Sequence, residues 1–214
     1  RSYPLTQPYW LDVEPNDIGL YEVSEQELIG LPKAEHPLSS TFTIEIDGLE
    51  LEYKVPLEYK WRDRVNGEMR RFFELRPEVM LIPEKNVYIA RNGKCTIQLT
   101  VKSGAAHNLQ VLVRPQIPKN WDIKPQLNNI KLEDIHDEVK IEFEIIPDKN
   151  STIGEINFFA ELLNGGNGMP ISYSLKAIQY EHIPYITWFP KSAIKVANLN
   201  LESKIKKLGY VMGS

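Results

Sequence analysis

The stretch Cys95-Thr-Ile-Gln-Leu-Thr-Val-Lys102 decides the fold, because its apolar residues alternate with polar ones. A similar period of two appears in Val139-Lys-Ile-Glu-Phe-Glu-Ile-Ile146. Successive side chains of a β-strand point to opposite faces, so this alternation predicts strands with one buried face and one solvated face. We therefore expect both stretches to form strands of a sheet that covers an apolar core.

Four more segments of the same character surround these two, at residues 86–90, 109–114, 155–163 and 171–178. Six or seven short alternating strands within about 100 residues, separated by turn residues, are typical of an antiparallel immunoglobulin-like β-sandwich. The side chains expected to face the core are Ile97, Leu99, Val101, Leu109, Val111, Val113, Val139, Ile141, Phe143, Ile145, Ile156, Phe158, Ala160, Leu162, Ile171, Tyr173 and Leu175.

The first 82 residues also contain strand signals. Phe42, Ile44 and Ile46 alternate with polar residues before the tight-turn pair Asp47-Gly48, and the alternation resumes through residues 49–55. A second hairpin is expected around Asn66-Gly67, with Leu57, Tyr59 and Trp61 sharing one parity that indicates a core face. This predicts a meander of about four strands.

We expect an all-β chain of two consecutive antiparallel β-sandwich modules, residues 1–82 and 83–182, with Pro83 near the hinge. Residues 183–214 are expected to be a linker. Within them, Tyr210-Val-Met212 before Gly213 predicts a buried strand that leads into an α/β domain beyond the chain, so the chain is expected to be an interior region of a longer protein.

Composition limits the classes of function. The 214 residues are 42% hydrophobic and 25% charged, which is typical of globular domains, and the net charge of −4 provides no basic field for nucleic acid. The sequence has no apolar run of about 20 residues, so we expect no transmembrane segment. Cys95 is the sole cysteine, so no internal disulfide is expected.

No catalytic constellation is visible in the sequence. The four histidines, His36, His107, His136 and His182, are too far apart in sequence to form a metal-binding pair on one element. His36 precedes Pro37 as in the His-Pro-Asp-Asp zinc motif, but Leu38 and Ser39 replace both aspartates. We therefore expect no catalytic residue, no metal ligand and no cofactor in this chain.

Aromatic residues are the remaining candidates for a binding site, because β-sandwich modules hold sugars on exposed Trp and Tyr rings. Packing in a core or between domains is the more common role of such rings, and we favour it for each of them. The candidates for ligand or interdomain contact are Tyr9, Trp10, Trp121, Tyr185 and Trp188. Tyr59 with Trp61 is a further aromatic pair, for which the shared parity favours the core.

Several short segments, taken in order, resemble the region that follows the catalytic domain in PIG-L (LmbE-like) deacetylases of Bacteroidetes-type bacteria. They are Gln7-Pro-Tyr-Trp-Leu11, Gly19-Leu-Tyr21, Leu28-Ile-Gly-Leu-Pro32, residues 55–59 and 64–68, Glu181-His-Ile-Pro184 and Leu208-Gly-Tyr-Val-Met-Gly213. Residues 117–121 and 139–147 also look like the immunoglobulin-like domain attached to NPCBM modules in α-galactosidases.

This resemblance implies an exported, extracytoplasmic parent protein with a zinc-dependent deacetylase domain upstream that acts on N-acetylated amino sugars. It also implies an α/β domain beginning near Gly209. We therefore expect an accessory, scaffolding role, with neighbouring domains of the same polypeptide as partners. The alternative is a carbohydrate-binding module with glycans as ligands, and a third reading is an enzyme in its own right.

Overall fold

The computed structural model describes residues 5–16, 18–32, 36–164, 168–180, 182–199, 207 and 209–210. In chain order, its elements are the 3-10 turns η1 (Tyr9–Leu11) and η2 (Gln26–Leu28), followed by the strands β1 (Ser39–Ile46), β2 (Leu49–Pro56), β3 (Glu58–Asp63), β4 (Gly67–Phe72), β5 (Val79–Pro83), β6 (Val87–Ile89), β7 (Cys95–Ser103), β8 (Leu109–Gln116), β9 (Asp122–Lys124), β10 (Asn128–Leu132), β11 (Glu138–Ile146), β12 (Ile153–Leu162), β13 (Lys176–Ile178), β14 (Ile186–Trp188) and β15 (Ala193–Ala197).

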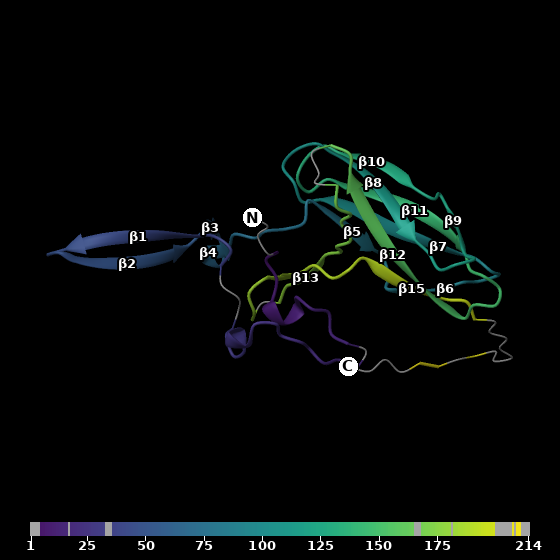
Figure 1. Ribbon diagram of the computed structural model, residues 1–214, viewed down its shortest axis with the longest axis horizontal. Coiled ribbons are helices and arrows are strands. Elements are labelled where there is room, and N and C mark those ends of the chain that lie inside the picture. The colour runs from purple at the N-terminus through teal and green to yellow at the C-terminus, as the bar shows by residue number, and fades with distance from the viewer. Residues whose placement is uncertain are drawn as a thin grey trace.

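Two sheets packed face to face form the main body (Figure 1). One sheet has the strand order β5-β7-β11-β9 and the other has the order β10-β8-β12-β15-β6. Their facing side chains form one continuous cluster of buried apolar residues. This arrangement is a β-sandwich of the immunoglobulin-like type, so the predicted all-β class and sandwich architecture are confirmed.

The alternation of the sequence explains the core. In β7, Cys95, Ile97, Leu99 and Val101 are all buried, while Thr96 and Gln98 are exposed. Phe143 from β11 and Phe158 from β12 meet across the two sheets with ring centroids 5.8 Å apart, and both are fully buried. Burying a side chain of this size stabilises the fold by roughly 2–3 kcal/mol.

Most of the predicted core-facing residues are buried or packed against the core, but the segment after β12 differs. Tyr173 is 40% exposed, whereas Ser174 is buried. Here the chain forms single bridges rather than a regular ladder, joining Ile171 to Ala160 and Tyr173 to Lys191. In this segment alternation therefore does not determine which side chains point inward, and the inward orientation predicted for Tyr173 is wrong.

The sandwich also extends beyond the expected limits of residues 83–182. β5 (Val79–Pro83) spans the expected boundary between residues 82 and 83 and pairs antiparallel with β7, so that boundary cuts through a strand. β15 lies in the expected linker and pairs with β12 inside the second sheet. One pair also departs from the expected antiparallel arrangement, because β15 and β6 run parallel; no hairpin joins these distant segments to impose an antiparallel register.

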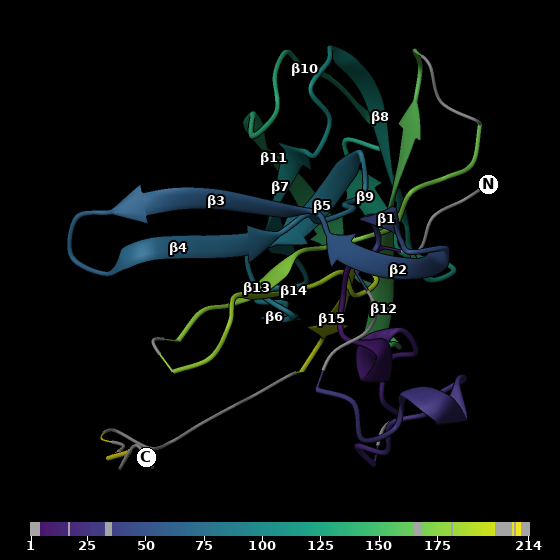
Figure 2. The same ribbon diagram turned by 90° about the vertical axis from the view of Figure 1, so that its left-hand side faces the viewer.

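The four strands expected in the first 82 residues are present, but they form two separate hairpins. β1 pairs with β2, and β3 pairs with β4, and neither hairpin belongs to a larger sheet. The two hairpins run in clearly different directions (Figure 2). The described residues before β5 therefore build no second two-layered core, because the apolar face of β1–β2 meets no facing sheet.

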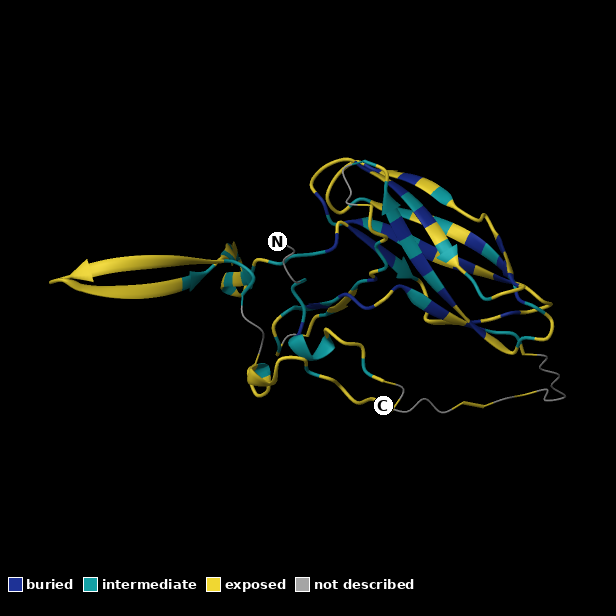
Figure 3. Ribbon diagram, viewed as in Figure 1, coloured by how far each residue is buried: buried dark blue, intermediate teal, exposed yellow. Residues whose placement is uncertain are grey.

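Hairpin β1–β2 projects away from the sandwich (Figure 3), and all of β1 and most of β2 are exposed. We call residues 39–56 the arm. One predicted feature lies partly outside the described residues: the strand at Tyr210-Val-Met212, since 211 and 212 are not described. Among the helices of the described part, none has the length and apolar character needed to cross a bilayer.

Candidate functional site

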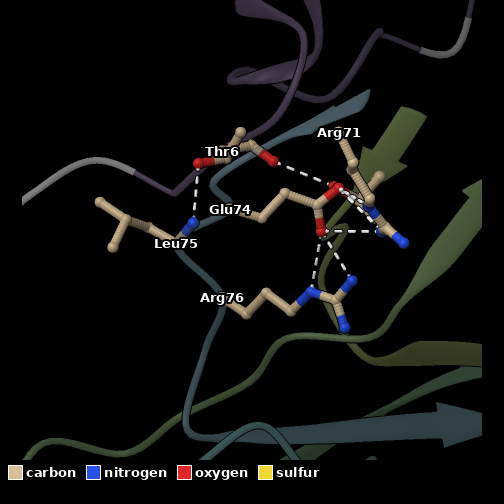
Figure 4. Close-up of polar contacts among 6 residues, drawn as sticks. Thr6, Arg71, Glu74, Leu75 and Arg76 are labelled. Carbon is tan, nitrogen blue, oxygen red and sulfur yellow. Dashed lines mark hydrogen bonds and ion pairs between the residues drawn. The ribbon is translucent and has the colours of Figure 1, made fainter. Parts of the chain in front are cut away.

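The junction between the hairpins and the sandwich brings together three segments that are distant in sequence. We call residues 5–14 the N-terminal strap. Thr6 exchanges two hydrogen bonds with Leu75 (Figure 4): its N–H donates to the Leu75 carbonyl at 2.9 Å, and its Oγ1 accepts from the Leu75 N–H at 2.8 Å. The Thr6 carbonyl accepts a hydrogen bond from Thr187 Oγ1 at 3.1 Å. The strap thus links the segment after β4 to strand β14.

Two further residues of the strap bond to the residues that follow β14. The Gln7 side-chain oxygen accepts a hydrogen bond from the backbone N–H of Phe189 at 3.0 Å. A carboxylate oxygen of Glu14 accepts one from the N–H of Lys191 at 2.6 Å. Thr187 and Phe189 are each only 3% exposed, so these bonds lie at the edge of a packed region.

Glu74 is the electrostatic centre of this junction. Arg71 donates from Nη2 to both carboxylate oxygens, at 2.9 and 3.1 Å, and Arg76 donates to Oε2 at 2.6 Å from Nη2 and at 3.0 Å from Nε. The Glu74 side chain is 11% exposed. Both of its oxygens are occupied by guanidinium donors, so the arrangement stabilises the junction and leaves no free carboxylate for acid–base chemistry.

Four of the five aromatic candidates surround this junction. Tyr9 and Trp10 meet edge to face with centroids 4.9 Å apart, and the Tyr9 hydroxyl donates to the carbonyl of Leu31. Arg71 lies over the ring of Tyr185 at 3.9 Å, and Lys176 lies over Trp188 at 4.9 Å. These cations occupy ring faces that a sugar would otherwise use for stacking.

Trp121 lies elsewhere, in the core at one end of the sandwich, where it is 5% exposed. Its ring packs over Gly154 at the start of β12, so closely that a Cβ at residue 154 would lie 2.4 Å from the ring. The structure therefore places Trp121 among the packing residues and gives it no open ring face for a ligand.

Strand β3 carries an aromatic pair whose predicted core position is wrong for one of its two rings. Tyr59 and Trp61 on β3 stack with centroids 5.5 Å apart, and Tyr59 is 67% exposed. Their parity suggested a core face, which is wrong for Tyr59 because hairpin β3–β4 has no sheet packed over it. An open apolar cleft of about 430 Å³ lies beside Tyr59, lined also by residues 71–74 and 76, Gly104, Ala106, Ile135 and His136.

Groups with metal-binding or nucleophilic chemistry are dispersed. No cluster of three or more His, Cys, Asp or Glu side chains is found in the described ranges. His36 stacks on Phe72 with centroids 3.9 Å apart. Burial raises the pKa of the Cys95 thiol to about 11, which keeps it protonated and unreactive at neutral pH.

The Arg71–Glu74–Arg76 cluster could not be recognised in the sequence. Residues 68–76 contain five charged residues, Glu68, Arg70, Arg71, Glu74 and Arg76, and such a run usually forms a solvated face. The low exposure of Glu74 arises only in the folded junction, where segments distant in sequence meet. The junction depends on contacts between residues about 70 to 180 positions apart in the sequence, which no local pattern reveals.

The sequence matches no protein-family model, and no curated protein matches it. Solved structures with a similar outline include WR4, an MSP family member of C. elegans (TM-score 0.34, 8% identity, 56% of this chain and 98% of that one). Others are the apo form of the Calx CBD1 domain (0.31, 12%, 58% and 100%) and an ASH/PapD-like domain of human CEP192 (0.32, 6%, 60% and 92%). Likeness at this level carries no information on function.

Proposed function

We propose that this chain is a non-catalytic accessory region that holds neighbouring domains of one polypeptide in a fixed arrangement. The observation that carries the proposal is the N-terminal strap, which is bonded both to the segment after β4 and to the residues around β14. A domain attached ahead of the strap would be anchored through these bonds to the segments after β4 and around β14, which adjoin the sandwich, rather than held by a free linker.

The parent protein in this proposal is an extracytoplasmic, zinc-dependent deacetylase of the PIG-L type that acts on N-acetylated amino sugars. Its support is the sequence resemblance alone. Zinc would belong to the catalytic domain that the resemblance implies upstream of residue 1.

The test compares this chain with the longer polypeptide that contains it. We expect the coding sequence before residue 1 to contain a His-Pro-Asp-Asp zinc motif. The 214-residue chain, supplied with zinc, should release no acetate from N-acetylglucosamine derivatives, whereas the longer polypeptide should release it. Turnover by the chain alone would refute the accessory role, and an upstream sequence without a deacetylase domain would refute the assignment of the parent.

Carbohydrate binding is the second candidate, and the exposed Tyr59 ring stacked on Trp61 is the observation that favours it. Titration of a glycan panel with Trp fluorescence would detect it, with Tyr59→Ala as the variant and Tyr21→Ala, another exposed tyrosine, as the control. A saturable signal lost only in Tyr59→Ala would establish a sugar site. Flat signals across the panel would exclude glycan binding, and the accessory role would be the only remaining candidate.

A further inference from the structure

The arm has one apolar face that nothing in the described structure covers. Its strand register places three apolar pairs on that face: Phe42 opposite Tyr53, Ile44 opposite Leu51, and Ile46 opposite Leu49. These six side chains are between 47% and 65% exposed. The other face carries Thr43 opposite Glu52 and Glu45 opposite Glu50.

Such a hairpin is a poor structure in isolation. A two-stranded sheet in water is marginally stable at best, and a third layer or a facing sheet is normally needed. Glu45 lies directly opposite Glu50, and like charges in that position weaken a strand pair further. The arm therefore needs an apolar surface against its uncovered face.

The size of the face fits a protein interface. Six side chains of this kind, each about half exposed, present roughly 600 Å², which is at the upper end for the largest apolar patch of a monomeric protein. Two such faces together would bury roughly 1,200 Å², which reaches the lower limit of a stable, specific interface.

We propose that the partner of the arm is the arm of a second copy of this chain, packed face to face and antiparallel about a two-fold axis near the Ile44–Leu51 pair. The inference does not depend on the proposed accessory function. Packed sheets lie about 10 Å apart, which the six side chains of each copy fill.

The gradient of side-chain size along the arm favours this antiparallel arrangement. The aromatic pair Phe42–Tyr53 lies toward the base, and the aliphatic pair Ile46–Leu49 lies at the tip beside the turn. A two-fold axis between these pairs places the large residues of one copy over the smaller residues of the other, so the interface is self-complementary and closed.

Charge distinguishes this packing from edge-to-edge pairing of the strands. The arm carries Glu45, Asp47, Glu50 and Glu52 against the single cation Lys54. Edge pairing would continue the acidic face from one copy to the next, whereas stacking of the apolar faces turns both acidic faces outward into water. The repulsion therefore disfavours an extended sheet and leaves the stacked dimer.

Sedimentation of the full 214-residue chain tests the proposal. The wild type should be a dimer. Ile44→Lys should weaken the dimer roughly 100-fold, since it buries an unpaired charge at the centre of the interface. Thr43→Lys, at the next residue on the opposite face, should remain dimeric. Circular dichroism of each variant checks that the sandwich, which contacts neither site, stays folded.

Two results would overturn the proposal. One is a monomeric wild type, whatever covers its arm, and the other is a dimer that Ile44→Lys leaves intact. Orientation is tested with a bis-maleimide cross-linker that spans the ~10 Å between packed sheets. A mixture of the single variants Tyr53→Cys and Ile46→Cys should cross-link between chains more efficiently than either variant alone, and equal yields would refute the antiparallel arrangement. The wild type, whose only thiol is the buried Cys95, is the control.

Discussion

Cys95 begins β7 with its thiol inside the sandwich, where the residue is 9% exposed. Burial raises its pKa from the ordinary 9.0 to about 11. We predict that the native protein reacts very slowly with a disulfide reagent at pH 8 and that it reacts fast once denaturant unfolds it. Fast reaction of the native protein would contradict this burial.

The same thiol makes stability depend on pH. Between pH 9 and 11 the unfolded chain loses a proton that the folded chain keeps, so the unfolded state binds fewer protons and stability falls as the pH rises. The contribution lost across that window is on the order of 2 kcal/mol. Urea unfolding should show a shallower decline for Cys95→Val than for the wild type; parallel declines would count against the raised pKa.

Gly154 is a second position where one atom matters. A Cβ there would lie 2.4 Å from the Trp121 ring and 2.9 Å from Pro118 Cγ. We predict that Gly154→Ala lowers the free energy of unfolding by about 2 kcal/mol, since overpacking a tight core forces its neighbours apart. Gly209→Ala, whose Cβ would meet open space, is the matched control and should leave the midpoint of thermal unfolding unchanged.

At the scale of elements, the strap and β14 depend on Glu74. Glu74→Gln keeps the shape of the side chain and removes the negative charge that pairs with Arg71 and Arg76. We predict that it lowers the free energy of unfolding by about 2 kcal/mol. Hydrogen exchange should rise in residues 5–14 and 186–191 and stay constant in β7. Glu68→Gln is the control, because Glu68 also binds Arg70 but is half exposed and far from the strap.

No change in exchange at the strap in Glu74→Gln would show that the backbone hydrogen bonds of Thr6 hold it without the ion pairs. An equal rise in Glu68→Gln would show that loss of any charge on hairpin β3–β4 has the same effect. Either result would remove Glu74 as the centre of the junction.

Length decided which strands the sequence could predict. β7, β11 and β12 are nine or ten residues long, and their alternation is sustained enough to identify both the strand and its inward face. β9 and β14 are three residues long, so they offer no period, and only their pairing with distant strands defines them.

For the two hairpins, the sequence predicted the strands and turns but not their surroundings. Asp47-Gly48 and Asn66-Gly67 located both turns, and the alternation located all four strands. Alternation predicts that one face is apolar, but it does not say what covers that face. The core expected beneath Tyr59 and along the arm is therefore absent from the described residues, while the junction around Glu74 had no local signal at all.

At the scale of the whole molecule, a rigid sandwich carries two appendages of different character. The strap is bound through polar contacts to the segments after β4 and after β14, whereas the arm extends into solvent with its apolar face exposed (Figure 3). The first arrangement fixes the position of a segment, and the second presents a surface for association. The strap is the basis of the proposed accessory role, and the arm is the basis of the proposed dimer.

Hydrogen exchange of the arm, measured as a function of concentration, tests this account most directly. Exchange in residues 39–56 should slow when the chain concentration is raised about 100-fold, because mass action covers the arm, while β7 and β11 should exchange equally slowly at both concentrations. Arm exchange that is fast and independent of concentration would contradict the account.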